Sequence, residues 1–142
     1  MNNQRKFVST IFYFCFTLAM LIFAAGSAAQ EKMTVAEIRE LIPSNTLSGK
    51  NEKQIMVHVY HDPTGTMEGV IRRQGMHFDS GNWTITDEDQ YCRRWNRWRG
   101  KALVCFHVYR LDNNKYRLKS VTGQYDLRFK VREGNPEGMK VF

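Results

Sequence analysis

"YRLKSVTGQYDLRFKV", residues 116–131, is the stretch of sequence that decides the fold. In its second half, apolar side chains alternate strictly with charged ones. The apolar members are Tyr125, Leu127, Phe129 and Val131. The charged members are Asp126, Arg128 and Lys130, and Arg132 continues the pattern directly after the stretch. A period of two is typical of a strand with one buried face. The turn residues "TGQ" join this strand to an earlier arm, "YRLKSV", and the two predict an antiparallel hairpin.

The same organisation extends upstream, where short extended segments are separated by turns. The turns are "HDPTG" at 61–65, "DEDQ" at 87–90 and "DNNK" at 112–115. Spacing of this kind predicts a mainly β protein with about seven or eight antiparallel strands. We expect a small up-and-down, lipocalin-like barrel or a strongly curled sheet, and full closure would remove exposed strand edges.

One short helix is predicted before the first strand. Thr34 and Glu37 have the spacing of a capping box, in which each side chain bonds the other residue's backbone. Pro43 ends the segment because its ring cannot continue a helix. The helix is expected to pack at one end of the β structure.

Residues 1–29 have the layout of a secretory signal peptide. Arg5 and Lys6 precede an apolar run over 7–23, and Ser27 and Ala29 fit a signal-peptidase site. An uncleaved membrane anchor is the alternative, because the apolar run approaches the length that spans a bilayer. Cleavage predicts an exported protein, periplasmic or secreted, with one domain over 30–142.

Two cysteines remain after cleavage, Cys92 and Cys105. An even pair outside the cytoplasm predicts a disulfide. The sequence contains no Cys-x-x-Cys motif, which would have favoured a metal site. The bond should join two neighbouring strands and stabilise the fold by about 3 kcal/mol.

The segment between these cysteines, "RRWNRWRGKALV", is basic and aromatic. Guanidinium groups beside indole rings can hold an anionic or amphipathic ligand by charge and stacking. The first candidate binding set, expected at the exposed tip of a hairpin, is Arg93, Arg94, Arg97, Trp98 and Arg99. The alternative is that Trp95 lies in the core and the arginines form a solvated loop.

A second candidate set follows from the alternation in the last two strands. It consists of Arg117, Lys119, Arg128, Lys130 and Arg132, which should all face outward. Like charges on neighbouring strands repel, so an anion bound there would relieve the repulsion. Solubility and the blocking of edge-to-edge pairing are the alternative explanations.

No familiar catalytic pattern occurs, neither G-x-S-x-G nor H-E-x-x-H, so the sequence predicts a protein that is not an enzyme. His58 and His61, with Asp62, do not complete a metal-ligand set, and no cofactor is expected. The chain's net charge of +7 falls to +5 on cleavage, because the signal segment carries two basic residues and no acidic one. Outside the cytoplasm, positive charge favours anionic lipids or glycans over nucleic acid.

Several segments resemble a small secreted bacterial family catalogued as a domain of unknown function. They are "NTLSGK" at 45–50, "PTGTMEG" at 63–69 and "GNWTITDEDQYCRRW" at 81–95, followed by a second cysteine in an apolar strand. The resemblance covers about residues 33–111 and implies a lipocalin-like β fold in the periplasm or at the surface, without an assigned activity.

The G-x-W…C part is also similar to periplasmic metalloprotease-inhibitor barrels, which insert an extended N-terminal segment into the protease. Here the corresponding segment, "QEKMTVAEI" at 30–38, is predicted to be helical, so no inhibitory residue is carried over.

These observations predict an exported binding protein whose basic, aromatic hairpin engages an anionic or amphipathic envelope component. That partner would be a lipid or a glycan, with peripheral membrane contact as one form of it. The alternatives are a protein-binding module such as a protease inhibitor, and a carrier of a small apolar ligand inside the barrel.

Overall fold

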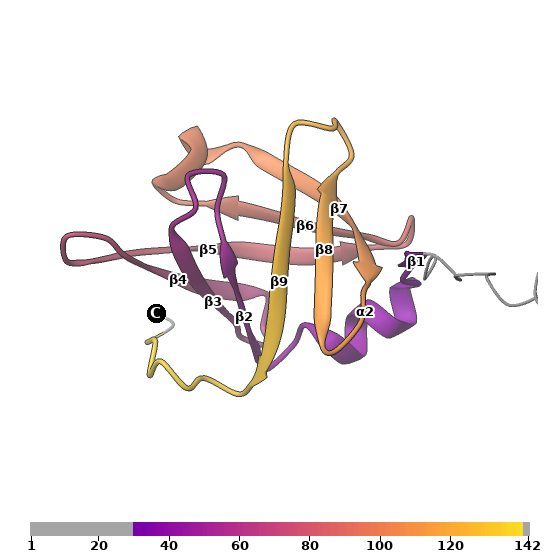
Figure 1. Ribbon diagram of the computed structural model, residues 1–142, viewed down its shortest axis with the longest axis horizontal. Coiled ribbons are helices and arrows are strands. Elements are labelled where there is room, and N and C mark those ends of the chain that lie inside the picture. Colours follow the sequence, from indigo (N-terminus) through magenta and orange to yellow (C-terminus); the bar gives the residue numbers. More distant parts are fainter. Residues whose placement is uncertain (1–29, 141–142) are drawn as a thin grey trace, which may run out of the picture.

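The computed structural model describes residues 30–140 and contains a closed barrel of eight antiparallel strands (Figure 1). The strands are β2 (Asn45–Lys50), β3 (Met56–His61), β4 (Thr66–Arg72), β5 (Met76–Thr86), β6 (Gln90–Trp95), β7 (Leu103–Arg110), β8 (Lys115–Ser120) and β9 (Asp126–Glu133). Each strand pairs with the next, and β9 returns to pair with β2. The predicted up-and-down barrel is therefore confirmed. The proposed signal peptide, residues 1–29, lies outside the described residues.

The alternation predicted for β9 is confirmed by burial. Leu127 and Phe129 are buried inside the barrel, whereas Arg128 and Lys130 are exposed on its outer surface. Phe129 lies opposite Tyr116 of β8, and the two rings stack with centroids 5.5 Å apart. Cross-strand aromatic pairs of this kind stabilise a sheet beyond the area they bury.

Helix α2 (Val35–Leu41) closes one end of the barrel, at the lower right of Figure 1. Its predicted capping box is present, since Thr34 Oγ1 accepts from the Glu37 amide and Glu37 accepts from the Thr34 amide. Ile38 and Ile42 are fully buried and pack in the same core as the barrel's interior side chains. A two-residue strand, β1 (Glu31–Lys32), precedes the helix and pairs with the end of β7.

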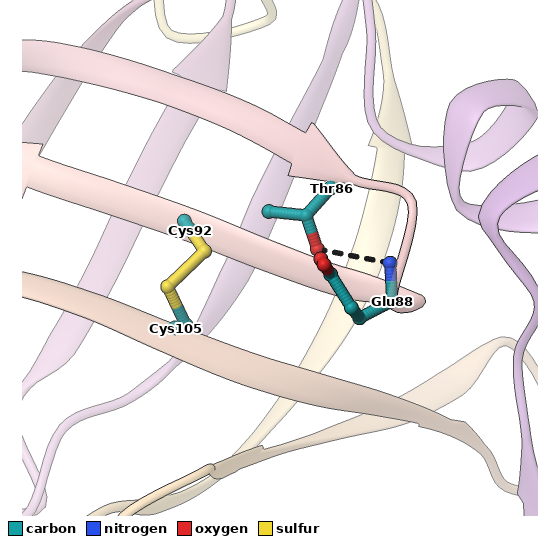
Figure 2. Close-up of a disulfide and its surroundings, with 4 residues drawn as sticks. All are labelled: Thr86, Glu88, Cys92 and Cys105. Carbon is teal, nitrogen blue, oxygen red and sulfur yellow. Dashed lines mark hydrogen bonds between the residues drawn. A yellow bond between two sulfur atoms is a disulfide. The ribbon is translucent and has the colours of Figure 1, made fainter.

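A disulfide joins Cys92 of β6 to Cys105 of β7, as predicted (Figure 2). The two residues lie directly opposite each other in the β6–β7 ladder. Their neighbours Tyr91 and Phe106 are fully buried in the interior, so the alternation of a strand directs the two cysteines to the opposite face of the sheet, where Cys92 is still buried. Figure 2 also shows the acidic β5–β6 turn, where the Glu88 amide donates to Thr86 Oγ1.

Candidate ligand-binding site

The end of the barrel opposite α2 is partly hollow. A cavity of about 230 Å³ opens there, and residues of the β2–β3 turn and of the short 3₁₀ segment η1 (Trp98–Lys101) help to line it. In Figure 1, the β2–β3 turn lies at the end of the barrel away from α2. Its walls are mainly apolar and come from strands far apart in the sequence. The apolar wall residues are Leu47, Val57, Val59, Ile71, Trp95, Trp98, Leu118, Leu127 and Phe129. Charged side chains lie at the rim, including Lys50, Glu52, Arg99 and Arg128.

Arg93 is the charged residue in the cavity wall, and only 7% of its surface is exposed. It lies on the interior face of β6, flanked by Tyr91 and Trp95. The guanidinium carbon is 5.1 Å from the ring centroid of Phe106 and 5.7 Å from that of Trp95. These ring faces attract the cation but do not replace hydrogen bonds.

The guanidinium of Arg93 lacks an anionic partner. Its Nε has no hydrogen-bond partner, and among the described residues no ion pair reaches Arg93. A buried charge without a counterion is unfavourable for folding, and such groups concentrate at functional sites. The Arg93 guanidinium, which forms no ion pair with any residue that the structure describes and lies beside a mainly apolar cavity, is therefore the centre of the candidate site.

The indole rings above Arg93 are positioned by two residues of neighbouring strands. Asp79, which is 2% exposed, accepts hydrogen bonds from the backbone amides of Arg97 at 3.0 Å and Trp98 at 2.7 Å. Gly69 gives the rings room, because a Cβ at this position would lie 2.6 Å from Trp95 and 2.8 Å from Trp98. The rings of Trp95 and Trp98 pack against each other with their centroids 4.7 Å apart.

Arg99 lies in η1, at the rim of the cavity, and its side chain contacts two further turns of the barrel. Its Nη2 donates to Glu52 Oε1 at 2.6 Å, and its guanidinium lies 4.1 Å from the ring centroid of Tyr125. Partial burial tends to raise the pKa of Glu52. The hydrogen bond and positive charge from Arg99, with a smaller effect from the charge of Arg93, bring this pKa below the ordinary value. The ionised pair links η1 to the β2–β3 turn, and Tyr125 adds the β8–β9 turn.

A second polar pair lies deeper in the barrel. His61 Nε2 and the Tyr91 hydroxyl are 2.7 Å apart, and both side chains are fully buried. Burial, reinforced by the positive charge of Arg93, lowers the pKa of His61 to about 3. Burial also raises the pKa of Tyr91, although the charge of Arg93 and a side-chain hydrogen bond with Arg93 oppose this rise. Both groups are therefore neutral at physiological pH, and Arg93 is the only charge among these three residues.

The structure divides the first predicted set between two environments. Arg93, Trp98 and Arg99 line the cavity, whereas Arg94 and Arg97 are exposed. The expectation that the whole set is exposed was wrong for Arg93, because the interior face of β6 carries residues 91, 93 and 95. The alternative, that Trp95 lies in the core, is confirmed by its 3% exposure.

All five members of the second set lie on the outer faces of β8 and β9, as predicted. Arg117 is bound by Asp126, and Arg132 donates to Glu137 at 2.6 Å. Sequence reasoning missed Lys50 and Lys115, which extend the same surface. Lys50 could not be assigned to it before the β2–β9 pairing was known. Asp79 and Gly69 were also missed, because a buried carboxylate and a close ring contact leave no periodic signal.

No protein-family model, curated protein or solved structure matches this chain. The resemblances described from the sequence therefore stay predictions. Within residues 30–140, none of the helices has the length and apolar character needed to cross a membrane. In the same part of the chain, no group of three or more His, Cys, Asp or Glu side chains is placed to hold a metal ion.

Proposed function

We propose that this chain is an exported, non-enzymatic binding protein that holds a small amphipathic anion inside its barrel. The observation that supports this most directly is the buried guanidinium of Arg93, which lies in the wall of a mainly apolar cavity and forms no ion pair among the described residues. The anionic group of the ligand would bond to Arg93, and its apolar part would lie against the cavity wall. Charge-assisted hydrogen bonds of this kind are strong when water is excluded.

The size of the cavity limits the ligand. An engineered apolar cavity of about 150 Å³ accommodates benzene, and sites for drug-sized ligands begin at about 300 Å³. At about 230 Å³, this cavity fits a single ring or a short to medium acyl chain bearing one carboxylate. The proposal thus joins two expectations from the sequence, the basic and aromatic contact and the carrier of a ligand inside the barrel.

Export is supported by the disulfide, because such bonds persist in oxidising compartments. Protease inhibition has less support. The segment that an inhibitor barrel would insert into its target is occupied here, since β1 pairs with β7 and Ile38 is buried in the core. We therefore propose a small-molecule ligand and do not propose a protease partner.

The test is to titrate ligand-stripped protein with octanoate and with 3-phenylpropionate. Tryptophan fluorescence reports binding. Trp95 and Trp98 line the cavity, so occupancy should change their emission. Octanol serves as the neutral comparison. We expect Arg93→Met to weaken carboxylate binding at least tenfold, because hydrogen bonds to charged groups contribute about 1.5–3 kcal/mol. Mass spectrometry of protein from its native host would identify a retained molecule.

Arg94→Met is the matched control, since this residue is on the same strand but exposed. Replacing a buried charge by an apolar residue of similar length is often neutral or stabilising, so Arg93→Met should remain folded. Equal carboxylate affinity in the Arg93 and Arg94 variants, or binding of octanol as tight as octanoate, would refute the proposal.

A further inference from the structure

A second site lies outside the barrel, on the outer faces of β8, β9 and β2. The closed ladder brings their basic residues together: Lys115 is opposite Lys130, and Arg117 is opposite Arg128. Like charges directly opposite each other destabilise a sheet. Lys50 extends the surface onto β2, because its neighbour Gly49 pairs with Phe129.

The acidic side chains nearby do not neutralise this surface. Asp126 is bound by Arg117, and its pKa is held below the ordinary value by that hydrogen bond and by the charges of Arg128 and Lys119. Glu137 pairs with Arg72 and Arg132. Within residues 30–140, five basic residues of this surface take part in no ion pair: Lys50, Lys115, Lys119, Arg128 and Lys130.

The surface is concave and chemically mixed. Four of these five residues line a groove of about 920 Å³: Lys50, Lys115, Arg128 and Lys130. Hydroxyl and amide side chains from Ser48, Gln54 and Asn114 also line it. Two carboxylates, Glu52 and Asp126, line it as well, and each is ion-paired with an arginine. We call this surface the basic groove. Outward-facing residues recur about every 6.7 Å along a strand, and adjacent strands are about 4.8 Å apart.

We infer that the basic groove binds an acidic oligosaccharide. The cations are spaced at intervals comparable to one or two sugar units, so an extended chain could meet several of them in succession. The hydroxyl and amide side chains can hydrogen-bond neutral sugar hydroxyls, a contact that a simple polyphosphate would not use. A concave surface suits such a chain better than it suits a flat bilayer. The basic groove adjoins the cavity, because Lys50 and Arg128 line both, but Arg93, Lys115 and Lys130 each line only one of them.

The probe is a heparin-derived hexasaccharide, titrated by calorimetry, with neutral maltohexaose as the comparison. Lys115→Glu combined with Lys130→Glu should weaken hexasaccharide binding at least tenfold, because like charges across an interface repel strongly. Binding by the unmodified protein should also weaken as sodium chloride rises from about 0.05 to 0.5 M, since salt screens exposed charges. Octanoate binding in the cavity should be unchanged in the double variant, which separates this inference from the proposed function.

The matched control is Arg94→Glu combined with Lys101→Glu, which makes the same change in net charge outside the groove. We expect this control to retain most of the hexasaccharide affinity. An equal loss in both double variants would show that only overall charge matters and would overturn the inference. Tighter binding to phosphatidylglycerol vesicles than to the hexasaccharide would overturn it in favour of a membrane surface.

Discussion

Arg93 and His61 lie in the same apolar interior, yet only Arg93 carries a charge at neutral pH. A guanidinium retains its proton under almost all conditions, whereas an imidazole loses its proton when burial makes the charged form unfavourable. The neutral His61 is paired with the Tyr91 hydroxyl at 2.7 Å. His61 adapts to burial by losing its proton. Arg93 cannot do so, and Arg93 is the residue that we assign to an anionic ligand.

The low pKa of His61 predicts that the protein loses stability in mild acid. The folded pKa is about 3 and the ordinary value is 6.5, so between these values the unfolded chain binds more protons. The free energy of unfolding should therefore fall as pH decreases through this window, by about 1 kcal/mol per pH unit from this group.

Urea denaturation between pH 5.5 and 6.5 measures this slope, because carboxylates with ordinary pKa values are almost fully ionised there. His61→Gln keeps a polar partner for Tyr91 but removes the titrating group, so its slope should be shallower. Identical slopes in the two proteins would contradict the assignment.

At the scale of elements, β6 and β7 form the wall that carries the cation. Their inward faces present Arg93 and Phe106 to the interior, and their outward faces are joined by the disulfide. The covalent bond therefore fixes the register of the two strands whose interior side chains surround the guanidinium.

Removing the disulfide should lower stability substantially. Cys92→Ala with Cys105→Ala opens a link between residues 13 apart in the sequence, and loop-closure entropy predicts a loss of about 3 kcal/mol. Guanidinium chloride denaturation compares the variant with the oxidised parent. Reducing the parent with a phosphine should reproduce the loss, and a difference below about 0.5 kcal/mol would be too small for a structural bond.

For the whole molecule, the fold was largely predictable and the site was not. The alternation of residues 125–131 and the regular turns carry the barrel signal, because a half-buried strand must repeat every second residue. The position of Arg93 was missed because "YCRRW" has apolar residues on both faces. The spacing of Tyr91 and Trp95 places Arg93 on their side, but only the closed barrel shows that this side is the interior.

Export is a prediction for the chain as a whole. The sequence places signal cleavage after Ala29, so protein recovered from a secreting cell should begin at Gln30. Its intact mass should also be lower by two hydrogens than that of the reduced form, because Cys92 and Cys105 are bonded. Retention of residues 1–29 would favour the membrane-anchor alternative, and two free thiols would contradict export to an oxidising compartment.

The return of β9 to β2 has a consequence for biogenesis. This ladder joins Asn45 to Glu133, so the barrel cannot close until nearly the whole chain has been synthesised and delivered. Such non-local pairing slows folding. Until β9 arrives, β2 and β8 remain open edges that can pair with other chains. A product truncated before residue 126 would keep both edges permanently and would aggregate.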